Sequence, residues 1–300
     1  MDIVLMTLGN TIDKTFYGFD TAIFEFFGKM QCSFLTFVAK IFTSFGDEAF
    51  VIPMIILGAV LMLFKKTRKY GITLFFAIII GTLITNVIVK PMALRIRPYN
   101  TLQGNADYWK WYIGAGALSE SDYSFPSGHT TAAFEVATAM FLTFRGEGKK
   151  KICWLFPVLA LCTMGSRVYL MVHYATDVLC GMIVGTFAGI VAYFLMKLCM
   201  KLIENVKIFK WIDNIDLGKA GFLKWTSGKA GAAVISIAVI GIFLFSFIPS
   251  FFEGGDAQRC AYVDEYDCYN EAKVDDEKYP PIDGKEYCKI HWKQLQGVEE

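Results

Sequence analysis

Long apolar runs separated by short charged segments dominate the pattern of this chain. A helix needs ~20 mostly apolar residues to cross a bilayer. Six runs come near that length, and they cover residues 49–64, 70–89, 130–144, 152–171, 178–202 and 230–252. The pattern predicts an all-α fold, a polytopic membrane helix bundle of about six transmembrane helices.

The N-terminal segment has a different pattern. Over residues 12–45, Phe24, Phe27 and Phe34 recur at helical spacing among charged residues. This predicts an amphipathic helix lying in the membrane interface, the alternative being a weak first span. Residues 1–10 lack a basic start followed by an apolar stretch, so no cleaved signal peptide is expected. We therefore expect an interfacial segment over 1–48, a six-span core over 49–252, and an acidic, cysteine-containing tail over 253–300.

The basic residues predict the orientation of the bundle. They are concentrated in the connections at 65–69, 145–151 and 203–229, which places those connections on the cytoplasmic side. The loop at 91–126, the turn at 172–177, the N-terminal segment and the tail then face outward.

Composition supports the membrane interpretation. Hydrophobic residues make up 55% of the chain and charged residues 19%, whereas a soluble domain is usually ~25% charged. The expected partners are the bilayer and a lipid, with no nucleic acid. The formal net charge of +1 says little about partners, because the charges are segregated along the chain.

Three short polar segments interrupt the apolar pattern, and all are expected on the outer face. The first holds Lys90 and Arg97, beside Pro91 and Pro98. The two cations lie two helical turns apart, or on a helix broken by the prolines, and can converge on a phosphate-sized anion. Taken alone, the segment is more typical of basic side chains reaching lipid headgroups.

The second polar segment is Pro126-Ser127-Gly128-His129, where a loop enters an apolar helix. Ser127 can cap that helix, and Gly128 lets its backbone approach a ligand closely. The first-turn N–H groups favour an anion, which would place His129 beside it. Alone, such a string is more often a cap than a catalytic site.

The third segment contains Arg167, His173 and Asp177. A carboxylate bonded to one imidazole nitrogen fixes the tautomer and leaves the other nitrogen free as a nucleophile. The simpler alternative is an ion pair of Arg167 and Asp177 with His173 between them. Ionisable groups at membrane depth are costly and usually functional, which favours the first interpretation.

Together the three segments supply what phosphoryl transfer needs: cations, backbone donors and two histidines, one of them with a carboxylate partner. No carboxylate cluster suited to Mg²⁺ is apparent. We therefore expect no metal and no cofactor in the reaction.

These segments resemble the type-2 phosphatidic acid phosphatase family, the membrane branch of a superfamily shared with vanadium haloperoxidases. The family pattern is Lys-x6-Arg-Pro, then Pro-Ser-Gly-His, then Ser-Arg-x5-His-x3-Asp. Every specified position is matched, by Lys90, Arg97, Pro98, Pro126, Ser127, Gly128, His129, Ser166, Arg167, His173 and Asp177. The resemblance covers roughly residues 15–200, and the tail lies outside it.

The resemblance implies a role for each matched residue. His173 would be the nucleophile that forms a phosphohistidine, Asp177 would orient it, and His129 would protonate the leaving group and then activate water. The phosphate oxygens would be held by Lys90, Arg97, Ser127, Gly128 and Arg167. The implied site opens at the outer membrane face.

A site in that position suits a lipid phosphate such as phosphatidate, phosphatidylglycerophosphate or undecaprenyl diphosphate. The chain is similar to bacterial members, so a bacterial plasma membrane is expected. A phosphotransferase that passes the phosphoryl group to another lipid, and a non-catalytic lipid-phosphate binder or transporter, are the alternatives. Haloperoxidase activity is not expected, because those relatives are soluble.

Two further features are interpreted more simply. The aromatic residues of the loop, among them Tyr99, Trp109 and Tyr112, are expected to anchor it at the interface as an aromatic belt. Cys260, Cys268, Cys288 and His291 of the tail form a possible Cys₃His set, but only the last two have familiar ligand spacing. A disulfide between two of these cysteines is favoured if the tail is external.

Overall fold

The computed structural model describes residues 7–219, 229–252, 260–262, 268–270, 272 and 279–297. The described part is almost wholly helical, with one isolated bridge between Ile282 and Lys285. In chain order the helices are α1 (Leu8–Lys29), α2 (Ser33–Thr43), η1 (Ser44–Gly46), α3 (Glu48–Met62), α4 (Arg68–Thr82), η2 (Leu83–Val89), α5 (Lys90–Ala93), α6 (Pro98–Thr101), α7 (Ala106–Gly114), α8 (Gly128–Gly146), η3 (Ile152–Trp154), α9 (Leu155–Tyr169), α10 (Ala175–Asn205), η4 (Lys207–Phe209), α11 (Lys210–Asn214), η5 (Leu217–Lys219), α12 (Lys229–Phe252) and α13 (Lys289–Gln296).

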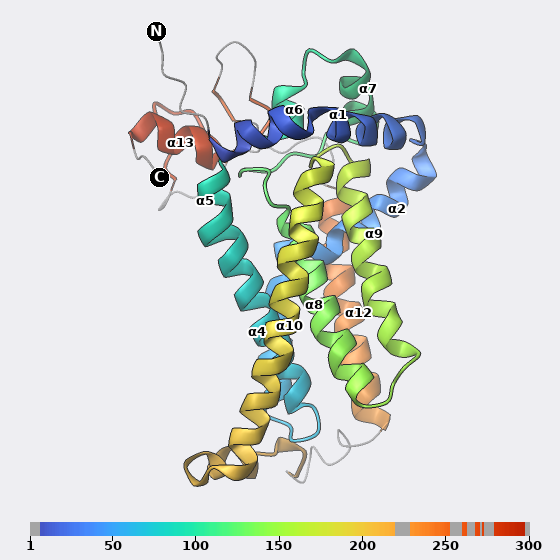
Figure 1. The fold of residues 1–300 in the computed structure, drawn as a ribbon, viewed down its shortest axis with the longest axis vertical. Helices are drawn as coiled ribbons and strands as arrows, with labels where there is room; N and C mark the ends of the chain where they lie inside the picture. Colours follow the sequence, from blue (N-terminus) through green and yellow to red (C-terminus); the bar gives the residue numbers. More distant parts are fainter. Residues whose placement is uncertain are drawn as a thin grey trace.

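The helices form a bundle around α8 and α10. Helix α10 packs against α8 and α4, and α8 also packs against α4 and α9. Helix α3 lies against α4, α2 against α9, and α12 against α3. Figure 1 shows the long helices running side by side, with α1, α6 and α7 gathered at one end.

Glycines on α10 allow its close approach to α8. A Cβ on Gly181 would lie 2.8 Å from the carbonyl oxygen of Ser127, and one on Gly185 would lie 2.5 Å from that of Thr131. Gly189 repeats the pattern one turn later. Residues four apart share a helix face, so α10 presents a stripe of small residues. Such stripes let membrane helices pack backbone to backbone.

Among the described residues, four helical stretches are long and apolar enough to cross a membrane: Arg68–Thr101, Ile152–Tyr169, Ala175–Asn205 and Ala230–Ile248. A fifth arises if Ser33–Gly46 and Glu48–Met62, bent by 42° at their junction, count as one span. The remaining predicted span, α8, has 19 residues but is not among them. Its polar side chains, including Thr131, Glu135 and Thr143, are buried inside the bundle. They face protein and lower the apolar character of the helix.

The N-terminal prediction is only partly correct. Instead of one helix over 12–45, the chain forms α1 and α2, separated by a break at residues 30–32. Helix α1 lies across the end of the bundle (Figure 1), whereas α2 continues through η1 into the bent pair with α3. Gln31 and Cys32 are held at the break by Tyr169 of α9, through bonds of 3.2 and 3.1 Å.

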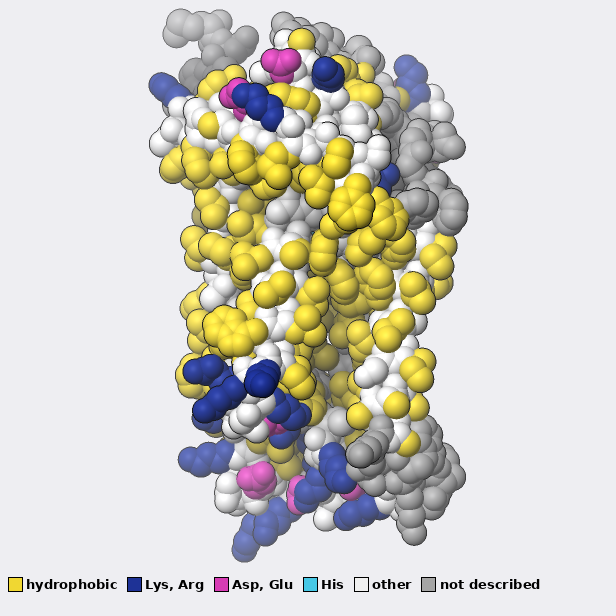
Figure 2. All heavy atoms as spheres, turned by 90° about the vertical axis from the view of Figure 1, so that its right-hand side faces the viewer, with side chains coloured by type: hydrophobic (Ala, Val, Ile, Leu, Met, Phe, Trp, Pro, Cys, Tyr) yellow, Lys and Arg dark blue, Asp and Glu magenta, His cyan; other side chains and the backbone are white. Residues whose placement is uncertain are grey.

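The basic connections gather at the opposite end, as predicted. Lys65 pairs with Asp213 at 2.8 Å, and Lys69 pairs with Glu147 at 2.5 Å. These contacts join the connections that follow α3, α8 and α10. Figure 2 shows hydrophobic side chains covering most of one flank, with Lys and Arg concentrated toward its lower end.

The prediction of an aromatic belt for the loop is wrong for its central tyrosines. Tyr99, Tyr108 and Tyr112 are buried in the core cluster at the end of the bundle that carries α1. The hydroxyl of Tyr108 donates to the carbonyl of Met171 at 2.5 Å, and the rings of Tyr99 and Tyr112 are stacked. These side chains pack the loop onto the turn between α9 and α10.

Candidate active site

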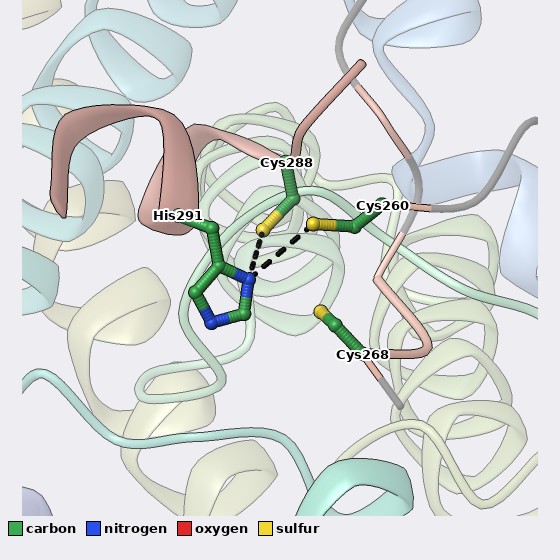
Figure 3. Close-up of side chains that lie close together, drawn as sticks. All are labelled: Cys260, Cys268, Cys288 and His291. Atoms are coloured by element: carbon green, nitrogen blue, oxygen red, sulfur yellow. Dashed lines mark hydrogen bonds between the residues drawn. The ribbon is translucent and has the colours of Figure 1, made fainter. Parts of the chain in front are cut away.

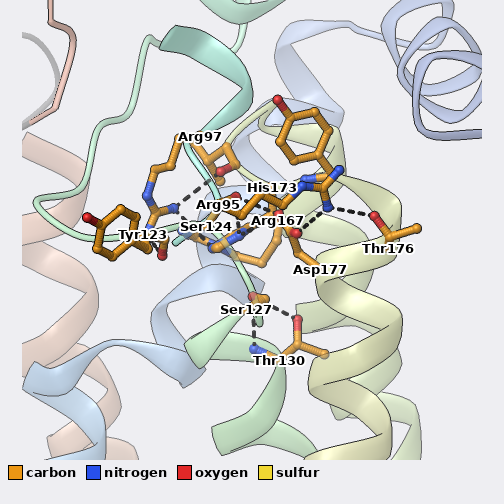
Figure 4. A network of polar contacts seen from close by, with 12 residues as sticks. Arg95, Arg97, Tyr123, Ser124, Ser127, Thr130, Arg167, His173, Thr176 and Asp177 are labelled. Carbon is orange, nitrogen blue, oxygen red and sulfur yellow. Dashed lines mark hydrogen bonds and ion pairs between the residues drawn. The ribbon is translucent and has the colours of Figure 1, made fainter. Parts of the chain in front are cut away.

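The three polar segments meet at the end of the bundle that carries α1. The first follows the π-helical segment η2. It begins with the short helix α5, which ends where Leu94 adopts a left-handed conformation. The second begins α8, and the third joins α9 to α10. Backbone bonds tie them together, from the Ser127 amide to the carbonyl of Asp177 at 3.2 Å and from the Ser124 amide to that of Arg95 at 2.8 Å. Figure 4 shows the resulting network.

His173 is fully buried at the centre of this network. Its Nδ1 lies 3.3 Å from Ser124 Oγ and 3.4 Å from Asp177 Oδ2, while Arg97 Nη1 lies 3.1 Å from Nε2. A guanidinium can only donate, so Nε2 carries a lone pair and the ring proton is on Nδ1. Burial, followed by the positive charges of Arg97, Arg167 and Lys90, lowers the pKa of His173 well below its usual range. The ring is therefore neutral at neutral pH.

Asp177 is fixed by the start of α10. It is the third residue of the helix, and its Oδ2 accepts from the Tyr174 amide at 3.0 Å and from Ser124 Oγ at 2.5 Å. The pair of His173 and Asp177 thus meets across the start of a helix.

Arg95, which the sequence patterns did not single out, supports Asp177 from the other side. Its guanidinium bonds Asp177 Oδ1 at 2.5 Å and carboxylate oxygens of Asp13 and Asp20 at 2.8 Å. The last two residues belong to α1, so the N-terminal helix is bonded directly to the orienting carboxylate. In the sequence, this role of Arg95 was indicated only by its position as a charged residue between Lys90 and Arg97.

His129 lies at the first turn of α8, as expected. Its Nε2 is 2.8 Å from Asp47 Oδ1, and its Nδ1 is 3.8 Å from Glu120 Oε1. A Cβ on Gly46 would lie 2.6 Å from His129 Cβ, so the glycine allows the α2–α3 junction to reach the ring. Neither acidic residue was predicted. Asp47 could have been found from the sequence as an acidic residue at the edge of the first apolar run.

The three predicted cations are buried, with exposed fractions of 8% for Lys90, 1% for Arg97 and 3% for Arg167. Two carboxylates of the loop between α7 and α8 form ion pairs with these cations. Glu120 bonds Arg97 Nη2 at 2.6 Å and also bonds Arg167, while Asp122 bonds Arg97 Nη2 at 2.5 Å and also bonds Lys90. A carboxylate and a phosphate offer the same oxygen acceptors to these donors. These donors can therefore hold a phosphate in place of the two carboxylates.

Asp122 remains ionised in this position. Burial alone would raise its pKa, but the adjacent Lys90 and Arg97 outweigh burial and hold the pKa of Asp122 well below its usual range. Protonation near neutral pH therefore does not free the cations. A ligand has to displace the carboxylates from them.

Ser127 and Gly128 differ in what they offer. Ser127 caps α8, its Oγ accepting from the Thr130 amide at 3.4 Å and from the Thr130 hydroxyl at 3.1 Å. Its own amide is bonded to Asp177, as described above. Gly128 lies closer to the cations, because a Cβ there would be 3.9 Å from Lys90 Nζ. The cap is as predicted, whereas the backbone donors at this helix start belong to the residues after Ser127.

Replacing Glu120 with glutamine should strengthen the binding of inorganic phosphate to these cations, lowering its dissociation constant about tenfold. The change removes a charge that competes for Arg97 and Arg167, and a hydrogen bond to a charged group contributes ~1.5–3 kcal/mol. Calorimetric titration with phosphate at fixed pH measures the effect. Glu25→Gln, at an exposed residue paired with Lys29, is the matched control. Unchanged or weaker phosphate binding in Glu120→Gln would contradict the competition.

Comparisons with known proteins place this site in a family. The model of the PAP2 superfamily matches residues 70–201, which include all three polar segments. An undecaprenyl-diphosphatase of Sulfolobus acidocaldarius is 30% identical over 57% of this chain and 75% of its own length. The chain belongs to the PAP2 superfamily.

Other PAP2 relatives differ in the lipid that they are named for. Phosphatidylglycerophosphatase B of Bacillus subtilis is 33% identical over 52% of this chain and 70% of its own length. A lipid A 4'-phosphatase of Bacteroides thetaiotaomicron is 27% identical and covers 77% of this chain and 96% of its own length. The crystal structure of a transmembrane PAP2-type phosphatidylglycerolphosphate phosphatase from Bacillus subtilis aligns with a TM-score of 0.51 at 27% identity, over 67% of this chain and 94% of that one.

The family resemblance found in the sequence is thereby confirmed. The protein is a multi-pass membrane lipid phosphatase of the PAP2 superfamily, a family of metal-independent phosphohydrolases, and its substrates are lipid phosphates.

Proposed function

We propose that the enzyme hydrolyses a phosphomonoester or diphosphate of a membrane lipid through a phosphohistidine on His173. The observation that carries this proposal is the position of His173 Nε2, 3.1 Å from Arg97 Nη1, with Nδ1 directed to Asp177. A neutral imidazole with a lone pair beside a buried cation is placed to attack a phosphorus atom whose oxygens that cation holds.

The reaction proceeds in two displacements. In the first, Nε2 of His173 attacks phosphorus, the bond from phosphorus to the lipid oxygen breaks, and His129 gives its proton to that oxygen. Asp177 stabilises the positive charge on the phosphorylated ring. In the second, water attacks the same phosphorus, His129 takes the proton of the water, and the bond from nitrogen to phosphorus breaks. Inorganic phosphate leaves, and both histidines return to their starting states.

Lys90, Arg97 and Arg167 hold the phosphate oxygens during both steps, together with backbone donors at the start of α8 and the hydroxyl of Ser127. Asp47 positions His129 for proton transfer, because it holds Nε2 at 2.8 Å. The phosphate takes the place of Glu120 and Asp122 on the cations. The chain provides its own positive charge for the transition state, so no step needs a metal ion.

The site is proposed to open at the outer face of a bacterial plasma membrane. Basic connections favour the cytoplasmic side, and they lie at the end of the bundle opposite the site. In this arrangement α8 is a sixth span, and α1 is an interfacial helix with exposed Phe16, Phe19 and Phe26. The division into an N-terminal segment over 1–48, a core over 49–252 and an external tail over 253–300 is part of the same proposal.

A substrate panel tests the reaction. The purified protein in detergent, with EDTA present, is given phosphatidate, phosphatidylglycerophosphate, undecaprenyl diphosphate, a lipid A 4'-phosphate and a soluble phosphate ester. Release of inorganic phosphate from at least one lipid is expected, at a rate well above that from the soluble ester. Transfer to a second lipid without free phosphate would make the enzyme a phosphotransferase. No turnover by folded protein would leave a lipid-phosphate binder.

A further inference from the structure

The C-terminal tail brings four metal-binding side chains to one point. The Sγ atoms of Cys260, Cys268 and Cys288 and a ring nitrogen of His291 all lie within 4.8 Å of one another. The three cysteines are buried, with exposed fractions of 6%, 8% and 0%. His291 Nδ1 lies 3.3 Å from Cys260 Sγ and 3.4 Å from Cys288 Sγ. Figure 3 shows the side chains pointing toward a common centre.

The disulfide expected from the sequence is not formed, because all three cysteines are free. A disulfide would use two sulfur atoms and leave the third thiol and the imidazole without a function. A tetrahedral zinc ion with Zn–S bonds of ~2.3 Å and a Zn–N bond of ~2.0 Å separates its donor atoms by roughly 3.5–3.8 Å. The distances from Nδ1 to sulfur are close to that separation. We propose that Cys260, Cys268, Cys288 and His291 bind one Zn²⁺ ion.

The surroundings of the cluster fit a metal site. The His291 ring is stacked on Tyr262, with ring centroids 3.9 Å apart. Asn270 Nδ2 donates to Cys288 Sγ at 3.5 Å, the kind of outer bond that orients a ligand and stabilises a thiolate. Four protein ligands of the Cys₃His type leave no open coordination position, which is typical of a structural zinc site. Thiolate sulfur also favours zinc over Mg²⁺ or Ca²⁺.

Local structure brings the ligands together in a way that their sequence spacing concealed. Cys288 is the N-cap residue of α13, and His291 lies in the first turn of that helix. Cys260 and Cys268 lack the usual paired spacing, but the Cys260 amide donates to the carbonyl of Asn270 at 3.0 Å. That bond folds the chain back and places the two cysteines side by side.

The cluster is connected to the active-site loop through Asn270. Its Oδ1 accepts from the Tyr99 hydroxyl at 3.1 Å and from Asn100 Nδ2 at 2.9 Å. The Tyr99 hydroxyl in turn accepts from the amide of Glu120 at 3.0 Å. The zinc ion would therefore hold the tail against the loop that places Glu120 on Arg97 and Arg167. Metal binding does not depend on the proposed function.

Metal analysis of the purified full-length protein tests the proposal without an activity assay. About one zinc ion per chain is expected after purification without added metal. Cys288→Ser should reduce the zinc content at least fivefold, and Cys32→Ser, at an exposed cysteine of the N-terminal segment, should leave it unchanged. His291→Cys should retain zinc, because a fourth thiolate replaces the imidazole, whereas His291→Ala should lose it.

A second measurement uses the wild-type protein and so does not depend on whether the variants fold. Titration of the wild-type protein with a mercurial thiol reagent should release the zinc in step with modification of the tail cysteines. Wild-type protein without zinc, zinc retained by Cys288→Ser, or two tail cysteines joined in a disulfide would each overturn the proposal. If the panel of lipids gave no turnover but zinc were found, only the proposed function would fail.

Discussion

Replacing His173 with glutamine should abolish phosphate release from the lipid substrate, lowering the turnover rate at least ~10³-fold. The substitution removes the imidazole nitrogen that lies beside Arg97, so the proposed mechanism forms no phosphoenzyme in this variant. Rapid quenching of the wild-type enzyme in alkali should trap a phosphate adduct with the acid lability of phosphohistidine, and the variant should carry none. An unchanged melting temperature in detergent would show that the variant is folded.

His129→Gln is the matched variant for this test. It should also release phosphate slowly from the lipid, because an alkoxide leaves poorly without a proton donor. With an ester whose leaving group is acidic, however, it should still form the phosphoenzyme and accumulate it. A phosphate adduct on His173→Gln, or turnover within tenfold of the wild type, would contradict the assignment of His173 as nucleophile.

Replacing Arg95 with methionine should cause the largest loss of stability among single changes near the site. The Arg95 side chain is fully buried, and its guanidinium is the shared partner of Asp13, Asp20 and Asp177. Removing one partner of a buried ion pair typically costs ~3–5 kcal/mol, because a charge is left without compensation. The melting temperature in detergent and the yield of folded protein measure the effect.

Two further variants sharpen the test. Arg95→Lys keeps the charge but loses the fork of donors, so its stability should fall between those of the wild type and Arg95→Met. Arg145→Met removes an exposed arginine at the end of α8 and should change stability little. If Arg95→Met melted at the same temperature as Arg145→Met, the buried network would not contribute to the fold.

The three polar segments that the sequence singled out meet in the structure, because each of them lies at the end of a helix. Cations, a helix start and a histidine with a carboxylate four residues later are local patterns. Asp47 and Glu120 were missed because their contacts with His129 and Arg167 form only in the folded chain. Asp47 and His129 are 82 residues apart, and no local pattern records such a contact.

The fold was predicted in the same uneven way. Apolar runs indicated the long helices, but the break at residues 30–32 depends on Tyr169 of a distant helix. Tyr99 and Tyr112 were predicted to lie at the membrane interface as part of an aromatic belt. They pack in the core instead, because the loop folds back over the turn that carries His173. Cys260 and Cys268 lack paired ligand spacing in the sequence, and they come together through the bond from the Cys260 amide to Asn270.

The separation of the two histidines depends on glycines of α10, which have no side chain. His129 is the second residue of α8, and His173 lies just before α10. These two helices lie close together beside the site, where a Cβ on Gly181 would be 2.8 Å from the carbonyl oxygen of Ser127. A methyl group at that position would push the two helices apart and so widen the distance between the two histidines. The glycine stripe of α10 thus limits how far apart the two histidines lie, although none of its members touches either ring.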